Sequence, residues 1–567
     1  MNAPRWRRRA LAGCAVALLV VIAGCTHRPA AHDGAPVTSA TRPPASSVAP
    51  SSSSSPPPPS LPTPGPATAG GAITASLVPL PVLASTDESE SFTLTAATRV
   101  VAGPGADVRA VADDLADLLR PATGFPLPVS TADAASSPSD SIVLAIGADD
   151  ETLGAEGYDL TIARSGVLIS ANTAAGLFHG VQTLRQLLPP TIEATHASPG
   201  PWRIVGGRVV DYPRFAYRGA MLDVTRHFFP VADVERYIDE LALYKVNMLH
   251  LHLSDDQGWR IAIDSWPNLA AHGGSSEVGS RTRGGYYTKA QYTAIVRYAQ
   301  ARYITVVPEI DTPGHTNAAL SSYPELNCNG VAPPPYTGER VGFSSLCVNK
   351  PITYQFLDDV VTELAALTPG PYIHLGGDEA QSTTPSDYVT FVQKAQQIVS
   401  AHGKQLMGWA EISSAKLAAG AVAEYWNFND HGLSEQAAVA QGVKVVAAPA
   451  NHAYLDQKYD NRTALGLNWA GYSSVENSYT WDPLDGGRIS ESSLLGVEAP
   501  LWSETLRTMA DIQYMAWPRM AGIAEIGWTP KSERSWPTYA PRLARQAPRW
   551  TALGVNFYRS PQVTWVS

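Results

Sequence analysis

Cysteine, basic charge and long apolar runs are scarce in this chain. Only 4 of its 567 residues are cysteine, and 41 Lys and Arg residues stand against 51 Asp and Glu residues. This mildly acidic balance leaves no basic face that would bind a nucleic acid. The apolar run at 15–22 is too short for a membrane span. A Gly-rich loop of the nucleotide-binding kind is also missing, and we expect no cofactor.

The N-terminus predicts an export signal. A basic start at 5–9 is followed by the apolar run at 15–22 and then by Cys25. The residues that end at Cys25 resemble a bacterial lipobox, in which the cysteine is lipid-modified and becomes the new N-terminus. The residues at 11–14 also fit that pattern, but they precede the apolar run, so Cys25 is the predicted lipidation site. We expect 1–25 to be a lipoprotein signal peptide; a plain secreted protein with an incidental cysteine is the alternative.

A tether is predicted after the signal peptide. Residues 26–74 are rich in Ser, Pro, Thr and Ala, with only serine at 51–55 and only proline at 56–59. Such a segment buries too little apolar surface to offset the entropy of ordering, and its prolines favour extended backbone. A glycosylated stalk is equally compatible with this composition. The folded part is thus expected to be held at the outer face of the bacterial cell membrane, or to be shed or secreted.

The two remaining cysteines predict a disulfide. Cys328 and Cys347 lie 19 positions apart in a loop rich in Pro, Gly and Asn. In an exported protein such a pair is expected to be oxidised. Closing a loop of this size stabilises the fold by about 3 kcal/mol through loop-closure entropy. A metal site would need further Cys or His residues nearby, and none are present.

Two folded units follow the tether. Residues 75–210 mix strand and helix patterns: a buried strand at 141–146, two alternating strands at 158–162 and 166–170, and helical spacing at 174–188. We expect a small, non-catalytic α/β domain that packs on the second unit.

The second unit, 211–567, repeats a strand-then-helix pattern. Helical sequence alternates with eight short apolar runs, at 219–223, 248–253, 304–310, 372–375, 405–409, 422–426, 444–448 and 496–502. Eight such units predict an α/β fold with a C-terminal (β/α)8 barrel, whose active site lies at the C-terminal ends of the strands. An open doubly wound sheet is the alternative.

The fourth run ends in the most informative stretch. Asp378 and Glu379 follow directly after Gly376 and Gly377. Neighbouring side chains on a strand point to opposite faces, so both acids can serve one pocket only where the strand ends and the backbone turns. The glycines permit unusual backbone and close approach of a ligand. Two carboxylates in one pocket perturb each other, which allows one to act as an acid while the other stays charged.

Acids and large aromatic residues also end the other runs. Indole faces stack on the C–H faces of sugar rings, and carboxylates and arginine bind the hydroxyls, so this combination predicts a sugar-binding mouth. The residues concerned are Asp223, Arg226, His227, Asp255, Asp256, Trp259, Asp311, His315, Trp409, Glu411, Trp426, Tyr454, Asp456, Trp469, Trp502 and Glu504.

Together these motifs resemble a known family. The chain is similar to glycoside hydrolase family 20, the exo-acting β-N-acetylhexosaminidases. The matching motifs occur in the family's order and cover the barrel, at 217–229, 251–260, 308–315, 374–379, 454–456 and 501–504. The first folded unit resembles the small α/β domain that precedes the barrel in that family.

The resemblance implies a substrate-assisted mechanism. Glu379 is expected to protonate the glycosidic oxygen as general acid and then to activate water as base. Asp378 is expected to orient and polarise the substrate's 2-acetamido group, whose carbonyl oxygen attacks C1 and forms an oxazolinium ion. Most glycosidases use two separated carboxylates instead, and the adjacency of these two acids fits the substrate-assisted exception.

Other roles carry over residue by residue. Tyr454 is expected to bind the acetamido oxygen, and Asp255 and His315 are expected to form a supporting relay to Glu379. The remaining assignments concern substrate binding: Trp409, Trp426 and Trp502 around the acetamido pocket and ring, Arg226, Asp456 and Glu504 on the outer hydroxyls, and Trp469 on the next sugar. Glu309, Asp311 and Glu411 are either supporting groups or ordinary capping acids.

Several alternatives stay open at this point. A two-carboxylate barrel glycosidase would also cleave plain glucosides, and a family member of the lacto-N-biosidase kind would release disaccharides from a deeper pocket. A catalytically inactive surface sugar-binding lipoprotein would keep the tryptophans but lose the acid. A metal-dependent hydrolase would use His250 and His252; we expect both in the barrel interior and no metal ion.

The expected partner is an oligosaccharide or glycan that ends in N-acetylhexosamine. Chitin oligomers, peptidoglycan fragments and host glycans all present that group. The choice between glucosamine and galactosamine, and the oligomeric state, are left open.

Overall fold

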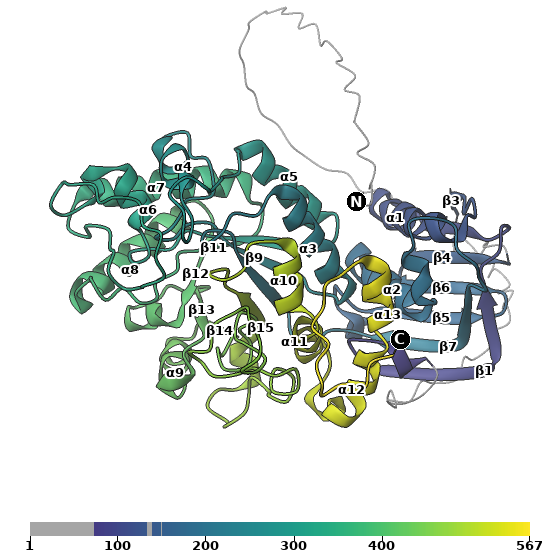
Figure 1. Ribbon diagram of the computed structural model, residues 1–567. Coiled ribbons are helices and arrows are strands. Elements are labelled where there is room, and N and C mark those ends of the chain that lie inside the picture. The colour runs from purple at the N-terminus through teal and green to yellow at the C-terminus, as the bar shows by residue number, and fades with distance from the viewer. Residues whose placement is uncertain (1–72, 133–138, 149, 567) are drawn as a thin grey trace, which may run out of the picture. The chain divides into compact units, whose positions relative to one another are not determined.

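The computed structural model describes residues 73–132, 139–148 and 150–566. These residues form a small α/β domain followed by a closed barrel of eight parallel strands, as predicted (Figure 1). The predicted signal peptide with Cys25, and the predicted tether except for its last two residues, lie outside the described residues. Among the helices described, none is long and apolar enough to cross a bilayer.

The small domain is built on one mixed sheet of seven strands, in the order β1-β7-β5-β6-β4-β2-β3. The hairpin expected from alternating sequence is present, because β5 and β6 pair antiparallel from Tyr158↔Ala171 to Ala163↔Gly166. The elements are β1 Leu83–Thr93, β2 Arg99–Ala102, α1 Ala106–Thr123, β3 Val129–Thr131, β4 Ser141–Ile146, β5 Tyr158–Ala163, β6 Gly166–Ala171, α2 Ala174–Leu187 and β7 Arg203–Asp211.

Helix α2 shows how local sequence sets the boundaries of an element. The Thr173 side chain accepts hydrogen bonds from the backbone N–H groups of Ala175 and Gly176 and so caps the helix. Pro189 and Pro190 follow its last turn, and proline cannot continue a helix. The predicted and observed ends therefore agree to within one residue.

The barrel strands run in chain order and close on themselves. They are β8 Tyr217–Asp223, β9 Met248–His252, β10 Thr305–Glu309, β11 Tyr372–His374, β12 Gln405–Trp409, β13 Val422–Tyr425, β14 Lys444–Ala447 and β15 Leu494–Leu501. Each coincides with one predicted run. The register aligns Asp223 with His252, His252 with Glu309, and Glu309 with His374. Four neighbouring strands therefore end in ionisable side chains at one level.

Helices surround the barrel strands (Figure 1). Thr288 and Gln291 form a reciprocal capping box at the start of α5. The helices are α3 Val231–Leu243, α4 Asn268–Ala271, α5 Lys289–Gln300, α6 Asn317–Ser322, α7 Pro351–Leu367, α8 Pro385–Ala401, α9 Leu433–Ala440, α10 Met509–Ala516, α11 Arg519–Trp528, α12 Trp536–Ala544 and α13 Ala547–Leu553.

Buried ion pairs connect the small domain to the barrel. Arg218 of β8 lies 2.7 Å from Glu156, and the Lys245 ammonium lies 2.9 Å from the Asp211 carboxylate. The Tyr158 hydroxyl also donates to Asp211, at 2.7 Å. Removing one partner of such a pair would leave an uncompensated buried charge, so these contacts hold the two parts in one arrangement.

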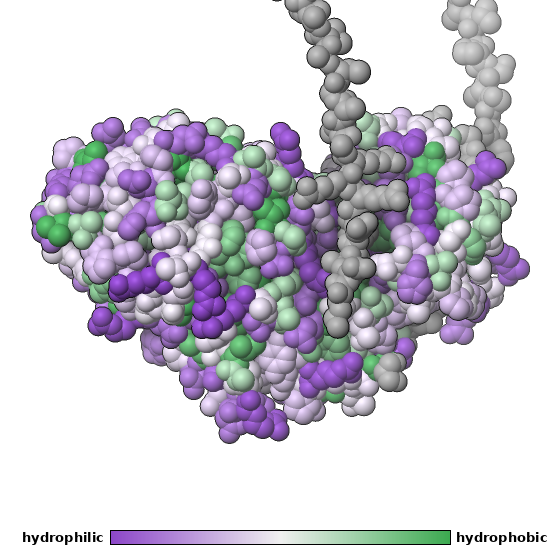
Figure 2. Space-filling view, turned by 45° about the horizontal axis from the view of Figure 1, so that its top comes forward, coloured by the Kyte–Doolittle hydropathy of each residue, from purple (hydrophilic) through white to green (hydrophobic). Residues whose placement is uncertain are grey.

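Cys328 and Cys347 form a disulfide, with their Cα atoms 4.8 Å apart. It closes the long loop that connects α6 to α7. On the face shown in Figure 2, hydrophobic residues are scattered among hydrophilic ones over the described part of the surface. The large apolar side chains instead fill the space between strands and helices.

Candidate active site

The turn after β11 brings the two neighbouring acids into one place. Gly376 and Gly377 have φ values of 65° and 107°, and Glu379 itself has a φ of 44°. A Cβ atom on Gly376 would lie 1.8 Å from a carboxylate oxygen of Asp311, so only glycine fits there. The unusual backbone predicted from the glycine pair is confirmed. The Asp378 side chain is 12 % exposed, whereas the Glu379 side chain is 31 % exposed.

His315, which follows β10, connects acids that follow the two neighbouring strands, β9 and β11. Its Nε2 lies 3.5 Å from Asp378 Oδ2 and 3.4 Å from Glu379 Oε2. Its Nδ1 lies 3.2 Å from Asp255 Oδ1. The structure therefore assembles the group that was expected to form a relay: Asp255, His315 and the acid pair.

Charge and burial perturb this group. Burial, reinforced by the Glu379 charge and opposed by His315, raises the pKa of Asp378 to about 6. Burial disfavours a charged imidazole, but the Asp255 and Asp378 carboxylates outweigh it and raise the pKa of His315 well above its usual range. A buried acid and a cationic partner with shifted pKa values at strand ends are typical of a catalytic site.

Arg226 is held at the mouth by two acids. Its guanidinium lies 2.8 Å from Asp255 and 3.4 Å from Asp223. Asp223 also accepts a hydrogen bond of 3.0 Å from the Ser503 backbone N–H, which connects the end of β8 to the end of β15. The guanidinium stacks over the Trp502 ring, 4.7 Å from its centre.

Five of the six predicted aromatic residues form one wall beside these acids; Trp259 instead lies buried in the main core, against Phe356. Trp409, Tyr454 and Trp502 belong to one buried cluster, and Trp426 packs against it. Trp469, 49 % exposed, lies edge-on to Trp426 and Tyr454 with ring centres 6.0 Å and 5.9 Å apart. Trp469 thus lies at the open side of the wall, and its place next to a second sugar stays a prediction.

Several buried polar atoms at this mouth have no hydrogen-bond partner among the described residues: Asp378 Oδ1, Asp456 Oδ1, Glu504 Oε2 and Arg226 Nε. Burial raises the pKa of Asp456 to about 8, with Glu504 adding to the effect. Burial also raises the pKa of Glu504 to about 7, against the opposing charge of Arg226. Buried polar groups are normally paired, so these unused donors and acceptors indicate where a hydroxylated ligand binds.

Sequence reasoning left the role of Glu309 open and assigned His252 only to the barrel interior. Glu309 is fully buried and accepts a hydrogen bond of 3.0 Å from Trp409 Nε1. Its other oxygen contacts His252 Nδ1, and His252 Nε2 lies 2.9 Å from Asp255. Glu309 therefore connects the aromatic wall to the relay. In the sequence, the feature that pointed to this role was the position of Glu309 at the end of a strand.

Two further acids left open by the sequence also support the site. Asp311 is buried and accepts a hydrogen bond of 3.2 Å from the Gly377 backbone N–H, directly below the acid pair. Glu411 accepts the Trp426 indole N–H at 3.1 Å. Both therefore orient other parts of the site, Asp311 the turn and Glu411 the Trp426 ring.

Metal ligation was considered for the histidines of β9. His250 and His252 are fully buried, but they lie among carboxylates rather than in an apolar core. By donor type, His250, His374 and Glu424 could hold an ion. However, His250 Nδ1 already lies 2.8 Å from Glu498 and His374 Nδ1 lies 3.0 Å from Glu309. Carboxylate partners of this kind also orient metal-bound histidines, so the expected absence of a metal ion stays a prediction.

Comparison with known proteins agrees with this geometry. The family model for the catalytic domain of glycosyl hydrolase family 20 matches residues 215–531, and the model for domain 2 of that family matches residues 74–212. A β-N-acetylhexosaminidase from Cellulomonas fimi is 42% identical over 492 residues, which is 86% of this chain and 97% of that protein.

Two solved structures are also similar. The family 20 β-N-acetylhexosaminidase from Streptomyces coelicolor A3(2) has a TM-score of 0.84 and 51% identity, covering 89% of this chain and 100% of that one. The Streptomyces plicatus enzyme, in complex with Thio-NAglucal, has a TM-score of 0.83 and 53% identity, covering 87% of this chain and 98% of that one. With its barrel, its paired acids and its aromatic wall, this chain belongs to glycosyl hydrolase family 20.

Proposed function

We propose that this enzyme removes a terminal β-linked N-acetylhexosamine from the non-reducing end of a glycan, with the substrate's own acetamido group as nucleophile. The observation that carries this proposal is the geometry of the acid pair. His315, Asp378 and Glu379 offer atoms that all lie within 4.8 Å of one another. An inverting glycosidase needs about 6.5–9.5 Å between its carboxylates to hold a water molecule. The two acids here lie too close together for that mechanism.

The two acids take different roles because their surroundings differ. The more exposed Glu379 protonates the glycosidic oxygen, so that the C1–O bond breaks as the leaving group takes up the proton. Asp378 is buried, and its unpaired Oδ1 accepts a hydrogen bond from the acetamido N–H. The acetamido oxygen forms the new bond to C1, and Tyr454 donates to it. Water activated by Glu379 then opens the oxazolinium ion, with net retention at C1.

The polar groups around the mouth explain exo action. Arg226, Asp456 and Glu504 keep unpaired atoms that match the outer hydroxyls of a terminal sugar. A mutant of the Streptomyces plicatus β-hexosaminidase, 52% identical to this chain, was solved with GlcNAc as its product. A single N-acetylhexosamine is accordingly the proposed product here.

A panel of nitrophenyl glycosides tests this function. The 2-acetamido substrates should be cleaved. The matched glucoside and glucosaminide lack the acetamido oxygen, whose intramolecular attack takes the place of a bimolecular step, so they should react at least about 10³-fold more slowly. Equal rates on both kinds of substrate would contradict the mechanism. A nitrophenyl disaccharide included in the panel separates single-sugar release from disaccharide release.

We predict an acidic limb in the pH profile. The pKa of Asp378 is raised to about 6, so this carboxylate becomes protonated as the pH falls through that value. A neutral carboxyl no longer stabilises the positive charge that develops on the acetamido group, and kcat/KM should fall by about tenfold per pH unit below it. The measurement is kcat/KM of the nitrophenyl N-acetylglucosaminide between about pH 4 and about pH 8. A flat profile down to about pH 4 in folded enzyme would contradict it.

We also infer that the enzyme is exported and lipid-anchored through Cys25 at the outer face of a bacterial cell membrane. The support is the basic start, the apolar run and the lipobox-like ending in the sequence. Replacing Cys25 with alanine is expected to move the hexosaminidase activity from the membrane fraction to the soluble fraction. Cys14→Ala is the matched control and should leave the activity on the membrane. Membrane-bound Cys25→Ala activity would contradict the anchor.

A further inference from the structure

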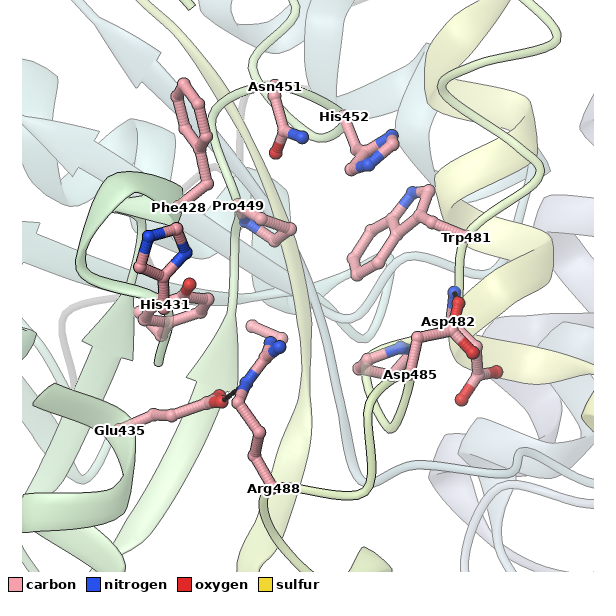
Figure 3. A pocket seen from close by; sticks show the side chains of 13 residues that line it. Phe428, His431, Glu435, Pro449, Asn451, His452, Trp481, Asp482, Asp485 and Arg488 are labelled. Carbon is pink, nitrogen blue, oxygen red and sulfur yellow. Dashed lines mark hydrogen bonds and ion pairs between the residues drawn. The ribbon is translucent and has the colours of Figure 1, made fainter. Parts of the chain in front are cut away.

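A second pocket lies outside the catalytic mouth, where the barrel lacks a helix. The described residues between β14 and β15 form no α-helix, and part of this connection lies beside the last residues of β13 and β14, Tyr425 and Ala447. They enclose a pocket of about 260 Å³ (Figure 3). The segment 449–456 contributes Asn451 and His452 to this pocket, and a few residues later it carries Tyr454 and Asp456 of the catalytic site.

One side of this outer pocket is lined by the Trp481 ring, which is 6 % exposed and firmly held. The Trp481 ring stacks on His452 with ring centres 5.9 Å apart and an angle of 18° between them. Its indole N–H donates to the Ser478 carbonyl at 3.0 Å. The neighbouring Asp482 is held by Arg214 at 2.6 Å and Arg534 at 2.5 Å, which fixes the loop. A large ring face set in a fixed loop is a good platform for the C–H face of a sugar.

Unused hydrogen-bonding groups face the same space. Arg488 uses its Nε to bind Glu435 at 2.6 Å, and no partner is found among the described residues for its two terminal nitrogens. The Asn451 Oδ1 atom is buried and also unpartnered within the described part of the chain. Figure 3 shows the Arg488 guanidinium and the Trp481 ring both directed into the pocket. A hydroxylated ligand can accept from the arginine and donate to the asparagine.

The charges around the pocket are balanced. Glu435 pairs with Arg488, Asp485 pairs with Lys531 at 2.6 Å, and Asp482 and Glu491 together offset Arg214 and Arg534. Burial lowers the pKa of His452, which keeps that ring neutral at physiological pH. Because each of these acids is offset by a base, neither an anionic nor a cationic ligand gains net electrostatic attraction from the pocket.

We propose that this outer pocket is a second saccharide site that binds one neutral pyranose ring. It goes beyond the proposed catalytic function, because none of its unused groups takes part in cleavage. A site with one stacking face and a few hydrogen bonds should bind a single sugar with a Kd of about 1 mM or weaker.

The test is NMR titration of the purified full-length protein with N-acetylglucosamine while a thiazoline inhibitor fills the catalytic pocket. Loss of turnover confirms that this pocket is blocked. Binding should remain, and Arg488→Gln and Asn451→Ala should each weaken it by about tenfold, the order of loss expected for one hydrogen bond from a charged group or to a buried acceptor. Both variants should keep the wild-type kcat/KM. Arg462→Gln, at an arginine with a 76% exposed side chain, is the matched control and should change neither value.

Three outcomes would overturn the proposal. They are no binding to the blocked enzyme, binding that both substitutions leave unchanged, and a preference for glucuronate or glucosamine over the neutral sugar. Trp481→Phe is a further variant that keeps an aromatic ring in the loop. It should weaken binding but leave the melting temperature unchanged, whereas truncation to alanine would lower the melting temperature.

Discussion

Replacing Asp378 with asparagine is expected to lower kcat by about 10²–10³-fold, the loss typical when one preorganised group that stabilises transition-state charge is removed. Asparagine keeps the size of the side chain and can still contact the acetamido group. It cannot balance the positive charge that develops on the acetamido nitrogen as its oxygen attacks C1. Because Asp378 is buried beside His315, water cannot replace the missing charge. Steady-state kinetics on the nitrophenyl N-acetylglucosaminide measure the effect.

Two further readouts separate this role from a structural one. The acidic limb of the kcat/KM profile near pH 6 should disappear in Asp378→Asn, because the group that titrates there is gone. Circular dichroism and the melting temperature should stay close to wild type. Asp113→Asn, at an acid of the small domain whose side chain is 48 % exposed, is the control and should leave turnover unchanged. Wild-type turnover in Asp378→Asn would refute its part in acetamido attack.

Replacing Glu379 with glutamine is expected to produce a loss that depends on the leaving group. With natural oligosaccharides, whose leaving group is a poor alkoxide, kcat/KM should fall by about 10²–10⁴-fold, the usual contribution of a general acid. An activated aryl leaving group departs without protonation, so kcat/KM should fall much less for that substrate. A series of aryl glycosides with leaving groups of increasing pKa should give a steeper dependence in the variant than in the wild type.

The control for this series is Glu151→Gln, at an exposed glutamate of the small domain, which should follow the wild-type dependence. An equal loss across all leaving groups in Glu379→Gln would mean that Glu379 does not act as the acid. His315 would then be the next group to examine, because its Nε2 is shared by both carboxylates.

Much of the architecture could be predicted because it depends on local pattern. Apolar runs of strand length and helical spacing reflect which side chains each segment must bury, and all eight predicted barrel runs became strands. The glycine pair before Asp378 predicted unusual backbone, and both glycines have a positive φ that other residues rarely adopt. Local motifs therefore located the acid pair and the aromatic residues.

The sequence alone determined the fold class, the strand ends that carry chemistry, and the identity of the acid pair, since each follows from residue type and short-range spacing. Only the tertiary structure decided which groups meet. Glu309 contacts Trp409 across 100 positions, and Asp223 contacts Ser503 across 280. The raised pKa of Asp378 and the outer pocket beside β14 likewise depend on burial and on the register of distant strands. These quantities are set by the closure of the barrel, which brings side chains together that no local pattern relates.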